Sequence, residues 1–301
     1  MTPPRSRTPS RRKSARPDEG VLFPLNRRDT TRLVRVALDE DGAFNDVTTI
    51  ATVVSDRRAR CRLVARQPGV IAGLPLAVET FRQLNSRVVI RVDGEDGRSV
   101  DAGAVFAVLS GSARGLLSAE RVALNFLQRL SGIASLTAKF VAAVEGTGAK
   151  ILDTRKTTPG WRSLEKYAVR AGGGVNHRMD LSAAILIKDN HLRALDGDLE
   201  LAIRRTRDMA PRGTKVEVEC DRLNQVKAAV AAGADVILLD NMKVEEIRRC
   251  VDVVQRRAIL EASGGVTLGN VRAIAKTGVD RISVGALTHS APALDLGLDF
   301  T

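Results

Sequence analysis

Short apolar runs alternate with amphipathic segments throughout the second half of the chain. The apolar runs fall at residues 151–152, 183–187, 216–218, 236–239, 259–260 and 282–284. Between them, hydrophobic residues recur at helical spacing at residues 162–171, 197–210, 222–232, 243–256 and 267–277. Strands that alternate with helices indicate a parallel sheet, because each crossover between parallel strands is usually a helix.

The first half of the chain has a different pattern. Helical spacing covers residues 26–38 and 76–84, whereas 58–66, 88–92 and 105–109 have the β-rich composition of strands, with 45–49 leading into the first strand. Turn pairs such as Asp93-Gly94 separate the later strands, which favours a mostly antiparallel sheet. Ser118 is the expected N-cap of a long helix that ends near Val144. These elements predict a small α+β domain.

These patterns divide the chain into a tail and two domains. Residues 1–20 are rich in Pro, Arg and Ser and nearly lack large apolar side chains, so we expect a disordered basic tail. The α+β domain is expected at 21–119 and the α/β barrel at 120–288. The alternation of strands and helices in the second half makes the chain an α/β protein and favours a barrel.

Composition narrows the functional class. The net charge of +12 invites a nucleic-acid interpretation, but aromatic residues make up only 3% of the 301 residues, which leaves no stacking platform for single strands. We therefore do not expect nucleic acid as a partner. No apolar run approaches the roughly 20 residues of a membrane helix, so no membrane association is expected. Three isolated cysteines and the lack of a secretory signal predict a cytoplasmic enzyme.

Charged residues stand where the predicted strands end. The cations at these ends are Arg155, Lys156, His177, Arg178 and Lys188. Parallel barrels place their active sites at the carboxyl ends of the strands, so we expect these side chains to converge on an anionic ligand. The alternative is that each is a solvated surface charge, which is the usual state of Lys and Arg.

Carboxylates and glycine-rich loops stand at the ends of the other predicted strands. Glu219 and Asp240 could hold Mg²⁺, which prefers oxygen ligands shared with substrate phosphates, or could simply balance the lysines. The glycines of Ser263-Gly264-Gly265 and the later Gly285 would let backbone N–H groups approach a phosphate, although a Gly-Gly turn can also lack a ligand.

The motifs DTRKT, NHR, LIKDNH, VEVE, LLDNM, EASGG and SVGALTH occur in this order. In order and spacing the chain resembles the quinolinate phosphoribosyltransferases from about residue 25 to its end. The resemblance implies transfer of phosphoribose from phosphoribosyl pyrophosphate to quinolinate, with decarboxylation and Mg²⁺, giving nicotinate mononucleotide, pyrophosphate and CO₂ for NAD biosynthesis. It also implies an incomplete (β/α) barrel plus an N-terminal α+β open-faced sandwich domain, which residues 289–301 join because the segment 294–300 returns to it. The implied assembly is a homo-oligomer, either a dimer or a hexamer.

The resemblance also assigns roles to single residues. The implied quinolinate-binding residues are Thr154, Arg155, His177, Arg178 and Lys188, together with Arg121 donated by a neighbouring subunit. The implied phosphoribosyl pyrophosphate-binding residues are Lys156, Glu219, Asp240, Ser263, Gly264, Gly265 and Gly285. The implied catalytic residues are Lys156, Lys188, Glu219 and Asp240, of which Glu219 and Asp240 would hold Mg²⁺ partly through the substrate.

Two other functions stay open at this point. The chain could be a paralogous phosphoribosyltransferase of the same fold that acts on another aromatic acid or a molybdenum-related substrate. The complete set of cations for a dicarboxylate argues against this alternative. From a different class, it could be a nucleic-acid-associated protein that uses its basic tail.

Overall fold

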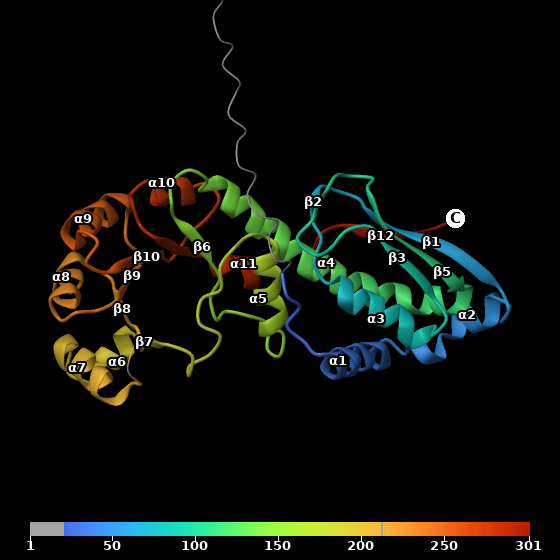
Figure 1. Cartoon of the computed structure of the whole chain (residues 1–301), viewed down its shortest axis with the longest axis horizontal. Coiled ribbons are helices and arrows are strands. Elements are labelled where there is room, and N and C mark those ends of the chain that lie inside the picture. The colour runs from blue at the N-terminus through green and yellow to red at the C-terminus, as the bar shows by residue number, and fades with distance from the viewer. Residues whose placement is uncertain (1–20, 212) are drawn as a thin grey trace, which may run out of the picture.

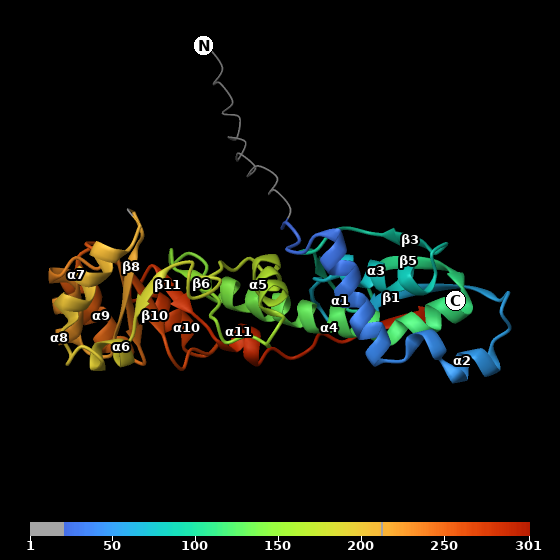
Figure 2. The ribbon, with the colours of Figure 1, turned by 90° about the horizontal axis from the view of Figure 1, so that it is seen from below.

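Two lobes joined by one long helix make up the chain (Figure 1). The computed structural model describes residues 21–211 and 213–301, so the predicted basic tail at 1–20 lies outside the described residues. The helix α4 (Ala113–Ala143) runs from the N-terminal lobe into the barrel lobe, and Figure 2 shows the same arrangement from below.

The N-terminal lobe contains a four-stranded antiparallel sheet in the order β12-β1-β5-β3. Its strands are β1 (Arg58–Ala65), β3 (Val89–Val92), β5 (Val105–Ser112) and β12 (Leu296–Phe300). A separate two-stranded sheet pairs β2 (Gly69–Val70) with β4 (Ser99–Val100). The helix α3 (Leu74–Leu84) and the first half of α4 share one core with the four-stranded sheet. The predicted open-faced sandwich is confirmed, including the return of the C-terminal segment, because Leu298 of β12 pairs with Leu63 of β1.

The start of α4 differs from the prediction. Ser112, and not Ser118, is the N-cap, and its side chain accepts a hydrogen bond from the Gly115 N–H. Ser118 lies inside the helix, where its hydroxyl donates to Asp46 at 2.9 Å. The helix begins earlier because β5 runs directly into it without a loop. The expected domain limit at 119/120 falls within this single helix and stays a prediction.

A second difference lies just before β1. The segment expected to lead directly into this strand contains a 3₁₀ turn, η1 (Ala43–Asn45), and a short helix, α2 (Val47–Thr52). The Asp46 side chain caps α2 by accepting from the Thr49 N–H at 2.9 Å, which lowers the pKa of Asp46. Hydrophobic spacing did not reveal α2 because it is one and a half turns long. The predicted first helix is confirmed as α1 (Arg27–Glu40).

The barrel lobe contains six parallel strands in the order β6-β11-β10-β9-β8-β7. These are β6 (Lys150–Leu152), β7 (Ile185–Ile187), β8 (Val216–Cys220), β9 (Val236–Asp240), β10 (Ile259–Ser263) and β11 (Arg281–Ser283). The two edge strands, β6 and β7, do not pair with each other in the described part of the chain, which confirms an incomplete barrel.

Helices connect the strands of the barrel at the five predicted positions. They are α5 (Arg162–Ala171), α7 (Leu199–Met209), α8 (Leu223–Ala231), α9 (Val244–Val254) and α10 (Val271–Ala275). Two short helices were not predicted: α6 (Asp189–Arg193) follows β7, and α11 (Ala286–His289) follows β11. Within residues 21–211 and 213–301, none of the helices is both long and apolar enough to cross a bilayer.

Alternation along the strands separates the core from the barrel interior. In β8, Val216, Val218 and Cys220 belong to the large hydrophobic core, whereas the intervening Glu217 and Glu219 point to the other face. In β9, Leu239 joins this core while Leu238 and Asp240 line the interior. The charged residues of these two strands therefore lie on the inner face of the barrel.

Candidate active site

A cavity of about 530 Å³ opens at the carboxyl ends of the barrel strands. It is large enough for small substrates and combines cationic, anionic and glycine-rich walls. The residues that line it are Thr154, Arg155, Lys156, His177, Arg178, Leu186, Lys188, Glu219, Leu238, Asp240, Asn241, Glu261, Ser263, Gly264, Gly265 and Ser283.

The cavity brings together most of the residues expected from the sequence. Two of them lie outside its lining. Gly285 is close by, since a Cβ atom built there would lie 3.3 Å from Cδ of Lys156. Arg121 is exposed on α4 and is not part of the cavity wall of this chain.

A buried ion pair anchors the loop that carries the first two cations. Asp153, which follows β6, is fully buried and pairs with Lys166 of α5, whose side chain is only 1% exposed. Lys166 Nζ also donates to the His177 carbonyl at 3.0 Å, and Asp153 accepts from the His177 N–H at 2.9 Å. Burial raises the pKa of Asp153 and lowers the pKa of Lys166, because water is withdrawn from both charges. The pair therefore ties the DTRKT loop to the NHR turn.

Two arginines face the cavity with unused donor capacity. Arg178 Nη1 donates to the Ala184 carbonyl at 2.9 Å, which holds its guanidinium in place. Burial and the nearby charge of Arg155 lower the pKa of Arg178. The buried Nε of Arg155 has no hydrogen-bond partner among the described residues. Neighbouring guanidinium groups with free donors are suited to a planar carboxylate ligand.

Lys188 lies at the end of β7, and the carboxylates Glu219 and Asp240 lie at the ends of β8 and β9. Lys188 Nζ lies 2.8 Å from Glu219 Oε2, and Asp240 Oδ2 accepts from Asn241 Nδ2 at 2.7 Å. In the pairing of β8 with β9, Glu219 lies opposite Leu238, two residues before Asp240 and on the same face. An all-oxygen donor set at the mouth of a cavity fits Mg²⁺.

The loop after β10 requires glycine. Gly264 has φ +91°, and a Cβ atom there would lie 2.2 Å from Oδ1 of Asn241 and 2.8 Å from its backbone nitrogen. The Asn241 N–H in turn donates to the Ser263 carbonyl at 2.9 Å. The two loops are therefore packed backbone to backbone, so closely that position 264 has no room for a side chain.

We expect Gly264→Ala to raise KM for the phosphorylated substrate roughly tenfold, the equivalent of about 1.4 kcal/mol. The added methyl group would push Asn241 away and disturb the loop on which a phosphate would rest. Steady-state kinetics with each substrate varied in turn would measure the effect. Gly146→Ala is the control, since Gly146 also has a positive φ (+78°) but an added Cβ meets nothing within 4 Å. An equal change in both variants would contradict the phosphate-loop assignment.

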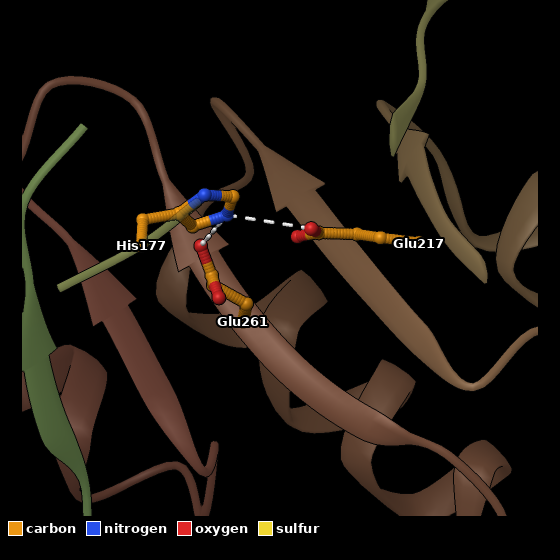
Figure 3. A group of neighbouring side chains, drawn as sticks. All are labelled: His177, Glu217 and Glu261. Atoms are coloured by element: carbon orange, nitrogen blue, oxygen red, sulfur yellow. Dashed lines mark ion pairs between the residues drawn. The ribbon is translucent and has the colours of Figure 1, made fainter. Parts of the chain in front are cut away.

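Two buried glutamates, of which Glu261 reaches the cavity lining and Glu217 does not, are absent from the residues expected in the site. Glu217 of β8 and Glu261 of β10 each place a carboxylate oxygen 3.3 Å from Nε2 of His177 (Figure 3). The sequence did carry a signal for Glu217, because it precedes Glu219 by two residues in a strand and so shares its face. The same spacing joins Glu261 to Ser263.

Two family models together match nearly the whole described chain. The N-terminal domain of quinolinate phosphoribosyl transferase matches residues 46–131, and the C-terminal domain of the same family matches residues 133–299. Both of the lobes described above are therefore represented in one known family.

Individual proteins give the same result. A nicotinate-nucleotide pyrophosphorylase [carboxylating] of Mycobacterium leprae is 47% identical over 280 residues, covering 90% of this chain and 96% of its own. A probable enzyme of the same name from Bacillus subtilis is 42% identical, with 92% and 95% covered. The solved structure of the nicotinate-nucleotide pyrophosphorylase from Francisella tularensis superposes with a TM-score of 0.88 at 39% identity, covering 95% of this chain and all of that one. The chain belongs to the quinolinate phosphoribosyltransferase family.

Proposed function

We infer that this chain is a pentosyltransferase that converts quinolinate and phosphoribosyl pyrophosphate into nicotinate mononucleotide, pyrophosphate and CO₂, a step of NAD biosynthesis. The family and the names of its relatives support this activity. The observation that carries it is the pair of guanidinium groups of Arg155 and Arg178, one with an unused buried donor, beside Lys188 in a single cavity. Three cations in one cavity suit a dicarboxylate and would be costly without it.

The cationic wall binds quinolinate in this proposal. Arg155, Arg178 and Lys188 hold the two carboxylates, with Thr154 and His177 beside them. The planar fork of an arginine can donate two parallel hydrogen bonds to one carboxylate, whereas Lys188 acts as a movable point charge. Removal of either substrate carboxylate would leave a half-buried cation without that partner, which would favour a dicarboxylate over a monocarboxylate.

The opposite wall binds phosphoribosyl pyrophosphate. Glu219 and Asp240 lie near the ribose, Lys156 near the pyrophosphate, and the backbone of Ser263–Gly265 with Gly285 around the 5′-phosphate. As pyrophosphate leaves C1 of the ribose, Lys156 stabilises its negative charge and the quinolinate nitrogen attacks the electron-deficient carbon. Positioning and electrostatic stabilisation account for most of the acceleration. The positive ring nitrogen then stabilises the electron pair that stays on the adjacent carbon when its carboxylate leaves as CO₂, and this carbon takes up a proton from water.

Mg²⁺ is the proposed cofactor, held by Glu219 and Asp240 partly through the substrate. When bound, it would supply positive charge to the pyrophosphate group. We expect EDTA to lower turnover more than tenfold and added Mg²⁺ to restore it. Tm should be the same with and without EDTA, because Lys188 already neutralises Glu219 in the metal-free fold. Full activity in EDTA would exclude this role for the metal.

A cytoplasmic homo-oligomer is the proposed assembly. Arg121 supports it, since this arginine is exposed on α4 and lies outside the cavity of its own chain. In a dimer or hexamer it would complete the quinolinate site of a neighbouring subunit.

The function is tested by incubating the purified chain with quinolinate, phosphoribosyl pyrophosphate and Mg²⁺. We expect nicotinate mononucleotide and CO₂ to form in equal amounts, and nicotinate to be rejected as a substrate. A folded protein that forms neither product, but transfers phosphoribose to another aromatic acid, would be the paralogue considered above.

A further inference from the structure

Two buried carboxylates lie beneath the cationic wall, and the proposed reaction gives them no role. Glu217 and Glu261 come from β8 and β10, the two strands that flank β9 in the sheet. Their side chains are 9% and 0% exposed, and each carries an oxygen 3.3 Å from Nε2 of His177 (Figure 3). Two carboxylates from separate strands thus contact the same ring nitrogen of a histidine that is far from both in the sequence.

The two carboxylates have few other partners. Glu261 Oε1 also accepts the hydroxyl of Ser283, and Arg281 lies 3.9 Å from Glu261 Oε2. Glu217 Oε1 and Glu261 Oε2 have no hydrogen-bond partner within the described part of the chain. A buried carboxylate is costly unless it is paired, so the His177 ring is the principal group that compensates both charges.

The backbone of His177 is fixed independently of its ring. Asp153 accepts from the His177 N–H, and Lys166 donates to its carbonyl. With the backbone fixed by this ion pair and the ring fixed by two glutamates, His177 has little freedom to turn. The residue that follows it is Arg178, one of the proposed substrate ligands.

The charges around the ring favour its protonated form. Burial alone would lower the pKa of His177, but the hydrogen bonds that its ring donates to Glu217 and Glu261, together with the negative charges of these carboxylates, outweigh burial and raise the pKa to about 9. The Arg178 N–H opposes this, since it lies 2.8 Å from Nδ1 and suits a neutral ring. The two buried carboxylates beside Nε2 favour the cationic ring more strongly than one backbone amide disfavours it.

We propose that Glu217 and Glu261 are positioning residues of the dicarboxylate site, which hold the His177 ring by Nε2 so that it faces the substrate as a cation. They act through His177 and do not themselves touch quinolinate. By stabilising the protonated ring, they keep a positive charge on His177 at the cavity wall, next to the arginines. The proposal rests on the quinolinate activity inferred above for its kinetic test, and a spectroscopic test is independent of that activity.

The kinetic test uses the isosteric variants Glu217→Gln and Glu261→Gln. Without one carboxylate, the pKa of His177 should fall toward its ordinary value near 6.5. We expect KM for quinolinate to rise about tenfold at pH 8 and to stay within about twofold of the wild type at pH 6. Neither the turnover number kcat nor the KM for phosphoribosyl pyrophosphate should change. Glu245→Gln, an exposed position on α9, is the matched control and should behave as the wild type at both pH values.

The spectroscopic test needs no substrate and no variant of the buried pair. The chain has three histidines, so the ring nitrogens of His177 can be assigned in nitrogen-15 spectra by comparison with His191→Gln and His289→Gln. We expect a doubly protonated His177 ring at pH 7.5 in the wild-type protein. A neutral ring at that pH would overturn the proposal, even if both glutamine variants failed to fold. It would equally be overturned by a KM for quinolinate that is unchanged at pH 8, or raised by the same factor at pH 6 and pH 8.

Discussion

Lys188→Ala lowers kcat/KM for quinolinate by about 10²–10³-fold, and the protein still folds. Loss of one partner from a desolvated charge pair costs roughly 2–5 kcal/mol, and Lys188 is a proposed partner of a substrate carboxylate. Stability should change little, because the Lys188 side chain is 44% exposed and belongs to no core. The measurement is steady-state kinetics at saturating phosphoribosyl pyrophosphate, combined with a thermal unfolding curve.

The control for this variant is Lys215→Ala. Lys215 is exposed and directly precedes β8, at the end of the barrel strands opposite to Lys188. The Lys215→Ala variant removes the same kind of side chain and the same charge as Lys188→Ala, and should leave kcat/KM unchanged. Equal kinetics for the Lys188 variant and the wild type would contradict the assignment of the cationic wall to quinolinate.

Lys166→Met lowers the free energy of unfolding by about 3–5 kcal/mol, the usual cost of removing one partner from a buried ion pair. Asp153 then keeps its hydrogen bonds from Asn176 and from the His177 N–H but loses the only cation in direct contact with it among the described residues. Because the same carboxylate ties the DTRKT loop to the NHR turn, binding of quinolinate should also weaken. Urea denaturation gives the free energy, and KM for quinolinate gives the binding effect.

A second variant separates loss of the charge pair from loss of packing. In Asp153→Asn combined with Lys166→Met no buried charge is left unpaired, so we expect part of the lost stability to return. Lys139→Met on α4 removes an exposed lysine and should change stability by less than about 0.5 kcal/mol. A loss below about 1 kcal/mol for Lys166→Met would show that the pair does not hold the two loops together.

Hydrophobic spacing was sufficient to predict the architecture. Each short apolar run of the second half became a parallel strand, because buried strands need consecutive apolar residues and their crossovers need amphipathic helices. The cations and carboxylates after these runs line one cavity, since all parallel strands end at the same edge. Short or local features were missed. Helix α2 spans only 6 residues, too few for hydrophobic residues to recur at helical spacing, and Ser118 resembled a cap although the chain was already helical there.

The sequence by itself determined the parallel strands with their crossover helices, the antiparallel sheet of the N-terminal lobe and the cationic residues of the cavity, because each depends on local spacing and on the rule that parallel strands share an edge. Only the tertiary structure decided which buried charges meet. Glu217, Glu261 and His177 come from three separate segments, and their contact depends on β8 and β10 being the two neighbours of β9. Strand order is set by packing over the whole domain, and no local pattern records it. The role of the glutamates as support for His177 therefore became visible only in the folded chain.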